Sequence, residues 1–283
     1  MRFSLVVNVS RPKALKVAEA LIQWFKARGI DFLVEKQAAK LLNEKGKVKK
    51  EELAEKSDII ITLGGDGTIL EASRYARGKP ILGVNLGRLG FLAEFSVDEM
   101  HSAIERALKG DFKTEHRTQL EASVKTGKKE KRFIALNDVI IEKGGYPRLP
   151  IISLRIDGSL LTDYKADGLI ISTSTGSTAY NMSAGGPIIV PKSRVFAITP
   201  ICPHMLTVRP IIISDDKELE IAVETPSKNF VLNCDGAIQL ALSPKTRVRV
   251  RKSDKPAILI ANEKRNYYDV LRQKFLWGRD HDA

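Results

Sequence analysis

The chain has 283 residues, of which 43% are hydrophobic and 28% are charged, and these values exclude a disordered or collagen-like protein. The sequence has no run of 18 apolar residues, so we expect a soluble protein, and its length favours two domains. It has only two cysteines, Cys202 and Cys234, so we expect a cytoplasmic protein without disulfides or zinc. The net charge of +12 indicates either a polyanionic partner or a solvated basic surface.

Strands and helices alternate from residue 1 to about 110, which predicts a parallel sheet covered on both faces. The expected strands are residues 3–7, 31–35, 58–63 and 80–85. The expected helices are residues 14–25, 51–56, 66–77 and 97–109. Ser10 is the expected N-cap of the first helix and Gly29 its end, and the lysine-rich stretch 45–50 is expected to be an exposed connection.

After about His116 the pattern changes to an alternation of apolar and polar residues with period two, which predicts a mostly-β domain. Examples are residues 152–156, 219–223 and 247–251. Asp157-Gly158 is a hairpin turn signal, and the cluster of charges at 125–132 is typical of a hairpin tip. A last helix is expected over residues 264–277, ended by Gly278. The domains are therefore expected at 1–116 and 117–261, followed by a C-terminal helical segment at 262–283.

The sharpest motif is Gly64-Gly65-Asp66-Gly67-Thr68, which follows a buried strand and precedes a helix. Ligands bind at this place in open α/β sheets, and the glycines allow the backbone to approach a phosphate. Asp66 would repel phosphate unless it binds a bridging Mg²⁺ or accepts a proton from an attacking hydroxyl, and both roles belong to phosphoryl transfer. An ordinary strand-to-helix turn is the alternative. The motifs of P-loop kinases and of Rossmann dehydrogenases are absent from the sequence.

Two further stretches are polar. Residues 172–180 and 183–187 are rich in Ser, Thr and Gly, which suits the edges of a sugar, an amide or an adenine, while Asp167 and Lys165 add charge beside them. Asn137-Asp138 interrupts an apolar run, so this pair either caps a turn or reaches into a site. The four histidines have no metal-binding spacing and are interpreted as structural or surface residues.

Taken in order along the chain, these stretches resemble the NAD kinase family, ATP-dependent enzymes that phosphorylate the 2′-hydroxyl of the adenosine ribose of NAD. The matching motifs are Gly64 to Thr68, Asn85-Leu86-Gly87-Arg88-Leu89-Gly90-Phe91-Leu92, Asn137-Asp138, Thr173 to Pro187, Cys202-Pro203-His204-Met205-Leu206 with Arg209-Pro210, and Cys234-Asp235-Gly236. The resemblance implies a Rossmann-like N-terminal α/β domain, a β-sandwich-like C-terminal domain and a C-terminal segment that returns to the first domain. It also implies a homodimer or homotetramer that binds no nucleic acid or membrane.

The same resemblance assigns roles to individual residues. Asp66 corresponds to the catalytic aspartate, which takes the 2′-hydroxyl proton or helps to hold Mg²⁺ or another divalent cation. ATP phosphates would contact Gly64, Gly65, Gly67 and Thr68. NAD would contact Asp66, Gly67, Asn137, Asp138, Arg148, Lys165, Asp167, Thr178, Ala179, Tyr180, Asn181, Met182 and Ser183. Three positions depart from the family pattern: Ser174 replaces a frequent proline, Ala237 a frequent Gln or Asn, and Glu71 a frequent basic residue.

Two alternatives compete with this interpretation. A lipid kinase of the diacylglycerol or sphingosine type resembles the chain in the same glycine-aspartate loop, but residues 173–187 are far more polar than an acyl-chain slot. No amphipathic membrane-facing helix is evident either. A nucleic-acid-binding β domain could use Arg247, Arg249 and Arg251, but that strand lacks interleaved aromatic residues for base stacking.

Overall fold

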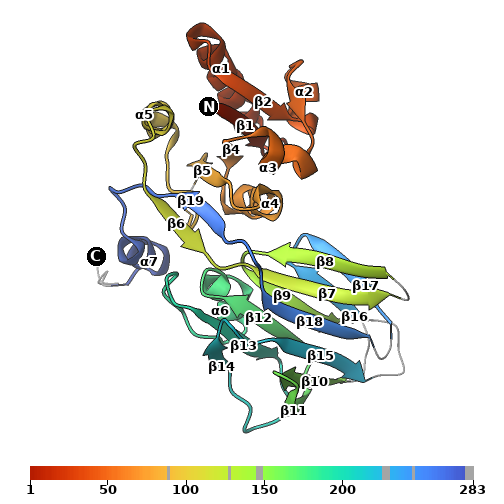
Figure 1. Cartoon of the computed structure of the whole chain (residues 1–283). Coiled ribbons are helices and arrows are strands. Elements are labelled where there is room, and N and C mark those ends of the chain that lie inside the picture. Colours follow the sequence, from red (N-terminus) through yellow and green to blue (C-terminus); the bar gives the residue numbers. More distant parts are fainter. Residues whose placement is uncertain (88–89, 127–128, 145–148, 225–229, 244–245, 278–283) are drawn as a thin grey trace. The chain divides into compact units, whose positions relative to one another are not determined.

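The computed structural model describes residues 1–87, 90–126, 129–144, 149–224, 230–243 and 246–277 (Figure 1). The chain forms two compact units: unit 1 comprises Met1–His116 with Ala257–Ala283, and unit 2 comprises Arg117–Pro256. Unit 1 is an α/β unit and unit 2 is mostly β, so the predicted fold class is confirmed. No helix in the described ranges is long and apolar enough to cross a membrane.

Unit 1 is built on a seven-stranded sheet with the order β3-β2-β1-β4-β5-β19-β6. Its strands are β1 (Arg2–Val7), β2 (Asp31–Glu35), β3 (Lys47–Val48), β4 (Ile59–Gly64), β5 (Pro80–Asn85), β6 (Thr114–Arg117) and β19 (Ala257–Ile260). The pairings from β3 through β5 to β19 are parallel, so the predicted parallel sheet is confirmed. β3, which lies within the expected exposed connection 45–50, and β19 were not predicted. The chain winds away from β1 in both directions, so the carboxyl ends of β1 and β4 mark the switch point where such sheets bind ligands.

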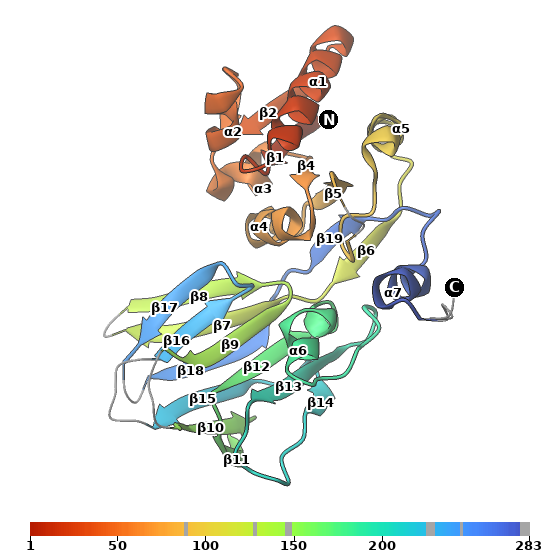
Figure 2. The same ribbon diagram turned by 180° about the vertical axis from the view of Figure 1, so that it is seen from behind.

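Helices cover both faces of this sheet (Figure 2). The helices of unit 1 are α1 (Pro12–Arg28), α2 (Lys36–Leu41), η1 (Lys50–Glu52), α3 (Leu53–Lys56), α4 (Asp66–Ala76), α5 (Val97–Leu108) and α7 (Tyr267–Phe275). The expected cap of α1 is wrong: Arg11 occupies the N-cap, and the Ser10 hydroxyl donates to Asn8 Oδ1 at 2.6 Å. Gly29 ends α1 in the left-handed conformation with φ 62°, as predicted.

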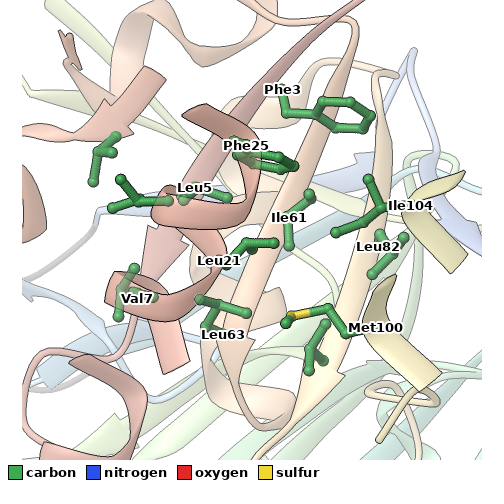
Figure 3. Packing of buried hydrophobic residues seen from close by; sticks show 14 of the residues in the cluster. Phe3, Leu5, Val7, Leu21, Phe25, Ile61, Leu63, Leu82, Met100 and Ile104 are labelled. Carbon is green, nitrogen blue, oxygen red and sulfur yellow. The ribbon is translucent and has the colours of Figure 1, made fainter. Parts of the chain in front are cut away.

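The core of unit 1 forms where alternate strand residues meet α1 and α5. Phe3 and Leu5 of β1 and Ile61 of β4 pack against Phe25 and Ile104 (Figure 3). On the opposite face α4 lies close to β5, because a Cβ at Gly83 would be only 2.4 Å from Ile69 Cδ1. This close packing fixes the position of α4 and therefore of the motif at its N-terminus.

Unit 2 consists of two six-stranded sheets. The first has the order β11-β10-β15-β18-β7-β8, with β7 (Leu120–Thr126), β8 (Lys129–Ala135), β10 (Ile151–Ile156), β11 (Ser159–Lys165), β15 (Leu219–Glu224) and β18 (Arg247–Lys252). The second has the order β14-β13-β12-β9-β16-β17, with β9 (Asp138–Lys143), β12 (Gly168–Thr173), β13 (Val195–Ile201), β14 (Ile211–Ser214), β16 (Phe230–Cys234) and β17 (Ile238–Leu242). Inward residues of both sheets, among them Leu154 and Ile171, share one core, as in a β-sandwich.

The structure can be compared with three predictions about turns and ends: the two hairpins and the end of the last helix. Asp157 and Gly158, with φ 48° and 81°, form the predicted hairpin turn between β10 and β11. β7 and β8 pair as a hairpin up to Thr126 and Lys129, as predicted. The last helix, α7, ends at Phe275 and has Leu276 as its C-cap, with a left-handed φ of 56°. The expected end, Gly278, lies outside the described residues.

The C-terminal part of the chain returns to unit 1. We expected this return at residue 262, but Ala257–Ile260 already form β19, which pairs with β5. α7 follows in the same unit.

Candidate active site

The glycine-aspartate motif lies at the carboxyl edge of the sheet of unit 1. β4 ends at Gly64, Gly65 is the N-cap of α4, and Asp66 is the first helical residue. A Cβ at Gly64 would lie 2.1 Å from Thr68 Oγ1, so this glycine permits the tight strand-to-helix connection. A Cβ at Gly65 or Gly67 would meet nothing within 4 Å. The two glycines and the N–H groups at the start of α4 therefore offer an open, anion-binding helix terminus.

The Asp66 carboxylate is held by the backbone of a distant loop. Phe91 N–H donates to Oδ2 at 2.8 Å, and the N–H groups of Leu92 and Ala93 donate to Oδ1 at 3.1 and 3.0 Å. We call residues 91–93 the aspartate cradle. A carboxylate has about four acceptor positions, and the described residues use three of those of Asp66. No donor among the described residues occupies the fourth position, on Oδ2, which suits one proton transfer or one metal bond.

Glu71, one of the departures from the family pattern, lies on α4 and forms an ion pair with Lys50 Nζ. Burial lowers the pKa of Lys50, but the hydrogen bond and charge of Glu71 outweigh burial and raise that pKa. Lys50 therefore remains charged and neutralises Glu71 at this face of α4.

Three of the sequence motifs meet at one end of the second sheet of unit 2. β9 lies between β12 and β16, and its first residue, Asp138, pairs with Ser172 at the end of β12. Val139 pairs with Cys234, the last residue of β16. The strand pairing thus brings Asn137-Asp138, the Ser/Thr-rich stretch and Cys234-Asp235-Gly236 together.

The side chain of Asp235 binds the backbone of the Asn137-Asp138 turn. Its carboxylate accepts the N–H groups of Leu136, Asn137 and Asp138 at 3.0, 2.8 and 3.2 Å. From the other side the backbone of Gly176 touches this turn, because a Cβ there would lie 2.1 Å from Asn137 O. The sequence motif included Asp235 without a role, and the contacts identify it as the residue that shapes the turn.

The Ser/Thr-rich stretch forms the short helices η2 (Gly176–Thr178) and α6 (Tyr180–Ser183). Asn181, an expected NAD contact, is fully buried, and its Nδ2 donates to Ser177 O and Pro187 O, both at 3.1 Å. Its Oδ1 accepts the Thr199 hydroxyl at 2.7 Å. The Asn181 side chain is thus committed to anchoring α6 on β13, whereas the neighbouring Tyr180 is 41% exposed.

The remaining expected NAD contacts lie along β12 and its neighbours. Asp167 precedes β12 and pairs with Lys143 Nζ at 2.6 Å, and the main chain of Lys165 accepts the His204 N–H at 2.8 Å. β12 is six residues long, so its two ends are roughly 17 Å apart at about 3.4 Å per residue. This separation suits an extended dinucleotide. Arg148, another expected contact, lies outside the described residues.

Acidic groups surround Tyr180. Burial and the charges of Glu142, Asp138 and Asp167 raise the pKa of the Tyr180 hydroxyl. Burial first, and then Asp235 and Glu142, raise the pKa of the Asp138 carboxyl to about 7. Glu142 is not among the residues predicted from the sequence, although the period of two along β9 places it on the same face as Asp138.

The pKa of Asp138 predicts a pH-dependent effect of Asp138→Asn. Because folding raises this pKa from 3.8 to about 7, the folded state favours the protonated carboxyl. The contribution of Asp138 to the free energy of unfolding should fall as pH rises from 4 to 7, by at most about 1.4 kcal/mol per pH unit. The variant lacks this loss, so its stability relative to wild type should be greater at pH 8 than at pH 5. Urea unfolding of both proteins at the two pH values measures this difference, and an equal difference at both would contradict the prediction.

Comparisons with known proteins agree with this geometry. Residues 3–112 match the ATP-NAD kinase N-terminal domain and residues 136–262 the ATP-NAD kinase C-terminal domain. An NAD kinase from Chloroherpeton thalassium is 53% identical over 283 residues, which is 100% of both chains.

Two solved structures resemble the whole chain. The yeast NADH kinase complexed with NADH has a TM-score of 0.91 and 26% identity, covering 100% of this chain and 90% of that one. An NAD kinase from Archaeoglobus fulgidus in complex with ATP has a TM-score of 0.76 and 25% identity, covering 97% and 98%. These proteins are kinases of NAD or NADH, and none of them supports the lipid-kinase alternative. The chain therefore belongs to the NAD kinase family of phosphotransferases, which act on an alcohol group.

Proposed function

We propose that this chain transfers the γ-phosphoryl group of ATP to the 2′-hydroxyl of the adenosine ribose of NAD, giving NADP and ADP. The observation that carries this proposal is the Asp66 carboxylate at the N-terminus of α4, which has one acceptor position that no described residue occupies. In the reaction the bond from the γ-phosphorus to the bridging oxygen of ADP breaks, and a bond from the 2′-oxygen to phosphorus forms. The proton of the 2′-hydroxyl passes to Asp66 Oδ2.

The two units have separate tasks in this proposal. In unit 1, Gly64, Gly65, Gly67 and Thr68 bind phosphates and Asp66 orients the acceptor hydroxyl. In unit 2, the dinucleotide is bound by Asn137, Asp138, Arg148, Lys165, Asp167 and residues 178–183, with Asn181 acting through the position of α6. Solved relatives of the same fold that hold NADH or ATP support this assignment.

The residues of unit 1 fit a divalent cation carried by the nucleotide. Within the described ranges no group of three or more His, Cys, Asp and Glu residues could hold a metal ion alone. Mg²⁺ in phosphoryl-transfer sites is usually held by one or two carboxylates together with substrate phosphates, and Asp66 offers one such position. A cation bound there would neutralise charge on the phosphates. In this proposal Asp66 accepts the proton, and the size of the rate loss in Asp66→Asn tests whether it also holds the cation.

The test is direct formation of NADP. Purified protein is incubated with Mg²⁺, ATP and NAD, and the product is detected with an NADP-specific dehydrogenase. We expect a signal that requires both ATP and NAD. Parallel reactions with NADH, other nucleoside triphosphates and polyphosphate define the acceptor and donor range. No NADP with any donor would contradict the proposal.

We further propose a cytoplasmic homo-oligomer, a dimer or a tetramer. The chain has only two cysteines, Cys202 and Cys234, which lie far apart in the sequence, and this supports a reducing compartment. The family resemblance supports the assembly. Light scattering of the purified protein tests the assembly, and a mass equal to one chain would contradict it.

A further inference from the structure

The loop that carries the aspartate cradle is covered by aromatic residues from the C-terminal helix. The ring of Phe91, whose N–H holds Asp66 Oδ2, lies 6.2 Å from the ring of Tyr267 and 6.2 Å from that of Phe275, measured between centroids. Lys274 Nζ lies 5.8 Å from the Phe91 centroid. Tilted aromatic pairs at these distances attract each other, so α7 restrains the side chain next to the first cradle N–H.

A polar network holds the other end of the same loop. Asn262 N–H donates to Glu94 Oε2 at 2.7 Å, and Asn262 Nδ2 donates to Glu94 O at 3.3 Å and to Glu99 Oε1 at 3.2 Å. Arg265 adds a bond to Glu99 Oε2 at 3.3 Å. Burial raises the pKa of Glu99, but hydrogen bonds from Ser96 and Asn262 outweigh it and lower that pKa to about 2. Glu99 therefore stays ionised in this network.

The C-terminal segment thus contacts Phe91 and Glu94, and the cradle residues Leu92 and Ala93 lie between these two positions. We propose that the C-terminal segment 262–275 braces residues 91–94, and that Asn262, Tyr267 and Phe275 are positioning residues that keep Asp66 in one orientation. The bracing acts through the backbone N–H groups of the cradle, since the segment makes its contacts with Phe91 and Glu94 on either side of Leu92 and Ala93. Its effect on the reaction rests on the proposed phosphoryl transfer.

The main test is the double variant Tyr267→Ala with Phe275→Ala. A misplacement of catalytic groups by about 1 Å costs on the order of 10²-fold in rate. We expect kcat to fall by about 10-fold to 100-fold, with KM for NAD and ATP changed less than about twofold. The single variant Tyr267→Phe keeps the aromatic ring, so we expect it to retain the wild-type kcat. Val270→Ala, a buried change on the same helix, should lower Tm but leave kcat at 25 °C unchanged.

Two further measurements separate bracing from simple destabilisation. In the Asp66→Asn background the double variant should lower the residual kcat no further, because the two changes act through one carboxylate. Hydrogen exchange of amides 91–93 should be faster in the double variant than in Val270→Ala, and this readout needs no activity. If wild type makes no NADP, the proposed function fails while hydrogen exchange still tests the bracing. An unchanged kcat, an equal loss in the Asp66→Asn background or unchanged exchange would overturn the inference.

Discussion

Asp66→Asn should lower kcat by roughly 10²–10⁴-fold while KM for NAD changes little. The amide keeps one oxygen but replaces the other with an NH₂ group, which is a donor. The cradle presents three N–H donors to this side chain, so the oxygen will face the two that bind Oδ1. The NH₂ group then occupies the open position, where the 2′-hydroxyl needs an acceptor. Steady-state kinetics with NAD and ATP measure both constants.

The matched control is Asp58→Asn. Asp58 directly precedes β4, and the glycine-aspartate motif begins at the other end of β4. Asp58 is exposed and its carboxylate accepts the Arg2 N–H at 2.7 Å, so the change alters the same charge far from the motif. We expect kcat to remain at the wild-type level. A near-normal kcat in Asp66→Asn would exclude the assigned role. A loss well above the range for general-base catalysis would show that Asp66 also holds the cation.

The fold of unit 1 is largely readable from local sequence. β2 and β5 have the predicted bounds, because apolar runs flanked by glycine, proline and charge are unambiguous. α2 and β3 are too short for any periodicity to show, and β3 forms by pairing with β2. β19 joins the sheet of unit 1 only after the chain has built the whole of unit 2, and no local pattern reports such a long-range pairing.

The candidate site is readable only where side chains carry the chemistry. The glycine-aspartate motif can be recognised in the sequence from its residue types, and so can Asn137-Asp138. The partners of Asp66 and Asp235 are backbone N–H groups, which every residue except proline has, so nothing in the sequence marks residues 91–93 or 136–138 as their partners. The family resemblance includes Gly90 and Asp235, but only the contacts explain why those residues are needed.

Surface ion pairs leave the net charge of +12 unchanged but reduce the local positive potential along β18. On the first sheet of unit 2, Arg247 pairs with Glu220 at 2.8 Å and Arg251 with Glu121 at 2.8 Å. Cations that already face carboxylates form a weaker polyanion surface than the sequence pattern of β18 indicates. The surface that motivated the nucleic-acid alternative is therefore a mixed one.

Gly90→Ala should lower kcat by on the order of 10²-fold without removing any catalytic group. A Cβ at Gly90 would lie 1.9 Å from Asp66 Oδ1 and 2.7 Å from Oδ2, closer than any real contact. The short Asp66 side chain can relieve this clash only by leaving the cradle, and buried N–H groups without an acceptor cost roughly 1–3 kcal/mol each. We therefore expect Tm to fall together with kcat. Kinetics and thermal unfolding of the same preparation measure the two effects.

Gly87→Ala is the control in the same loop. Among the described residues a Cβ there would meet only Arg11 Nη1, at 3.4 Å, and Gly87 is not one of the glycines with a positive φ, so alanine fits at this position. We expect wild-type kcat and Tm for Gly87→Ala. If Gly90→Ala lowers Tm but keeps kcat, the cradle stabilises the loop without placing the carboxylate. If Gly90→Ala instead matches Asp66→Asn in kcat, the orientation of the carboxylate is as important as its charge.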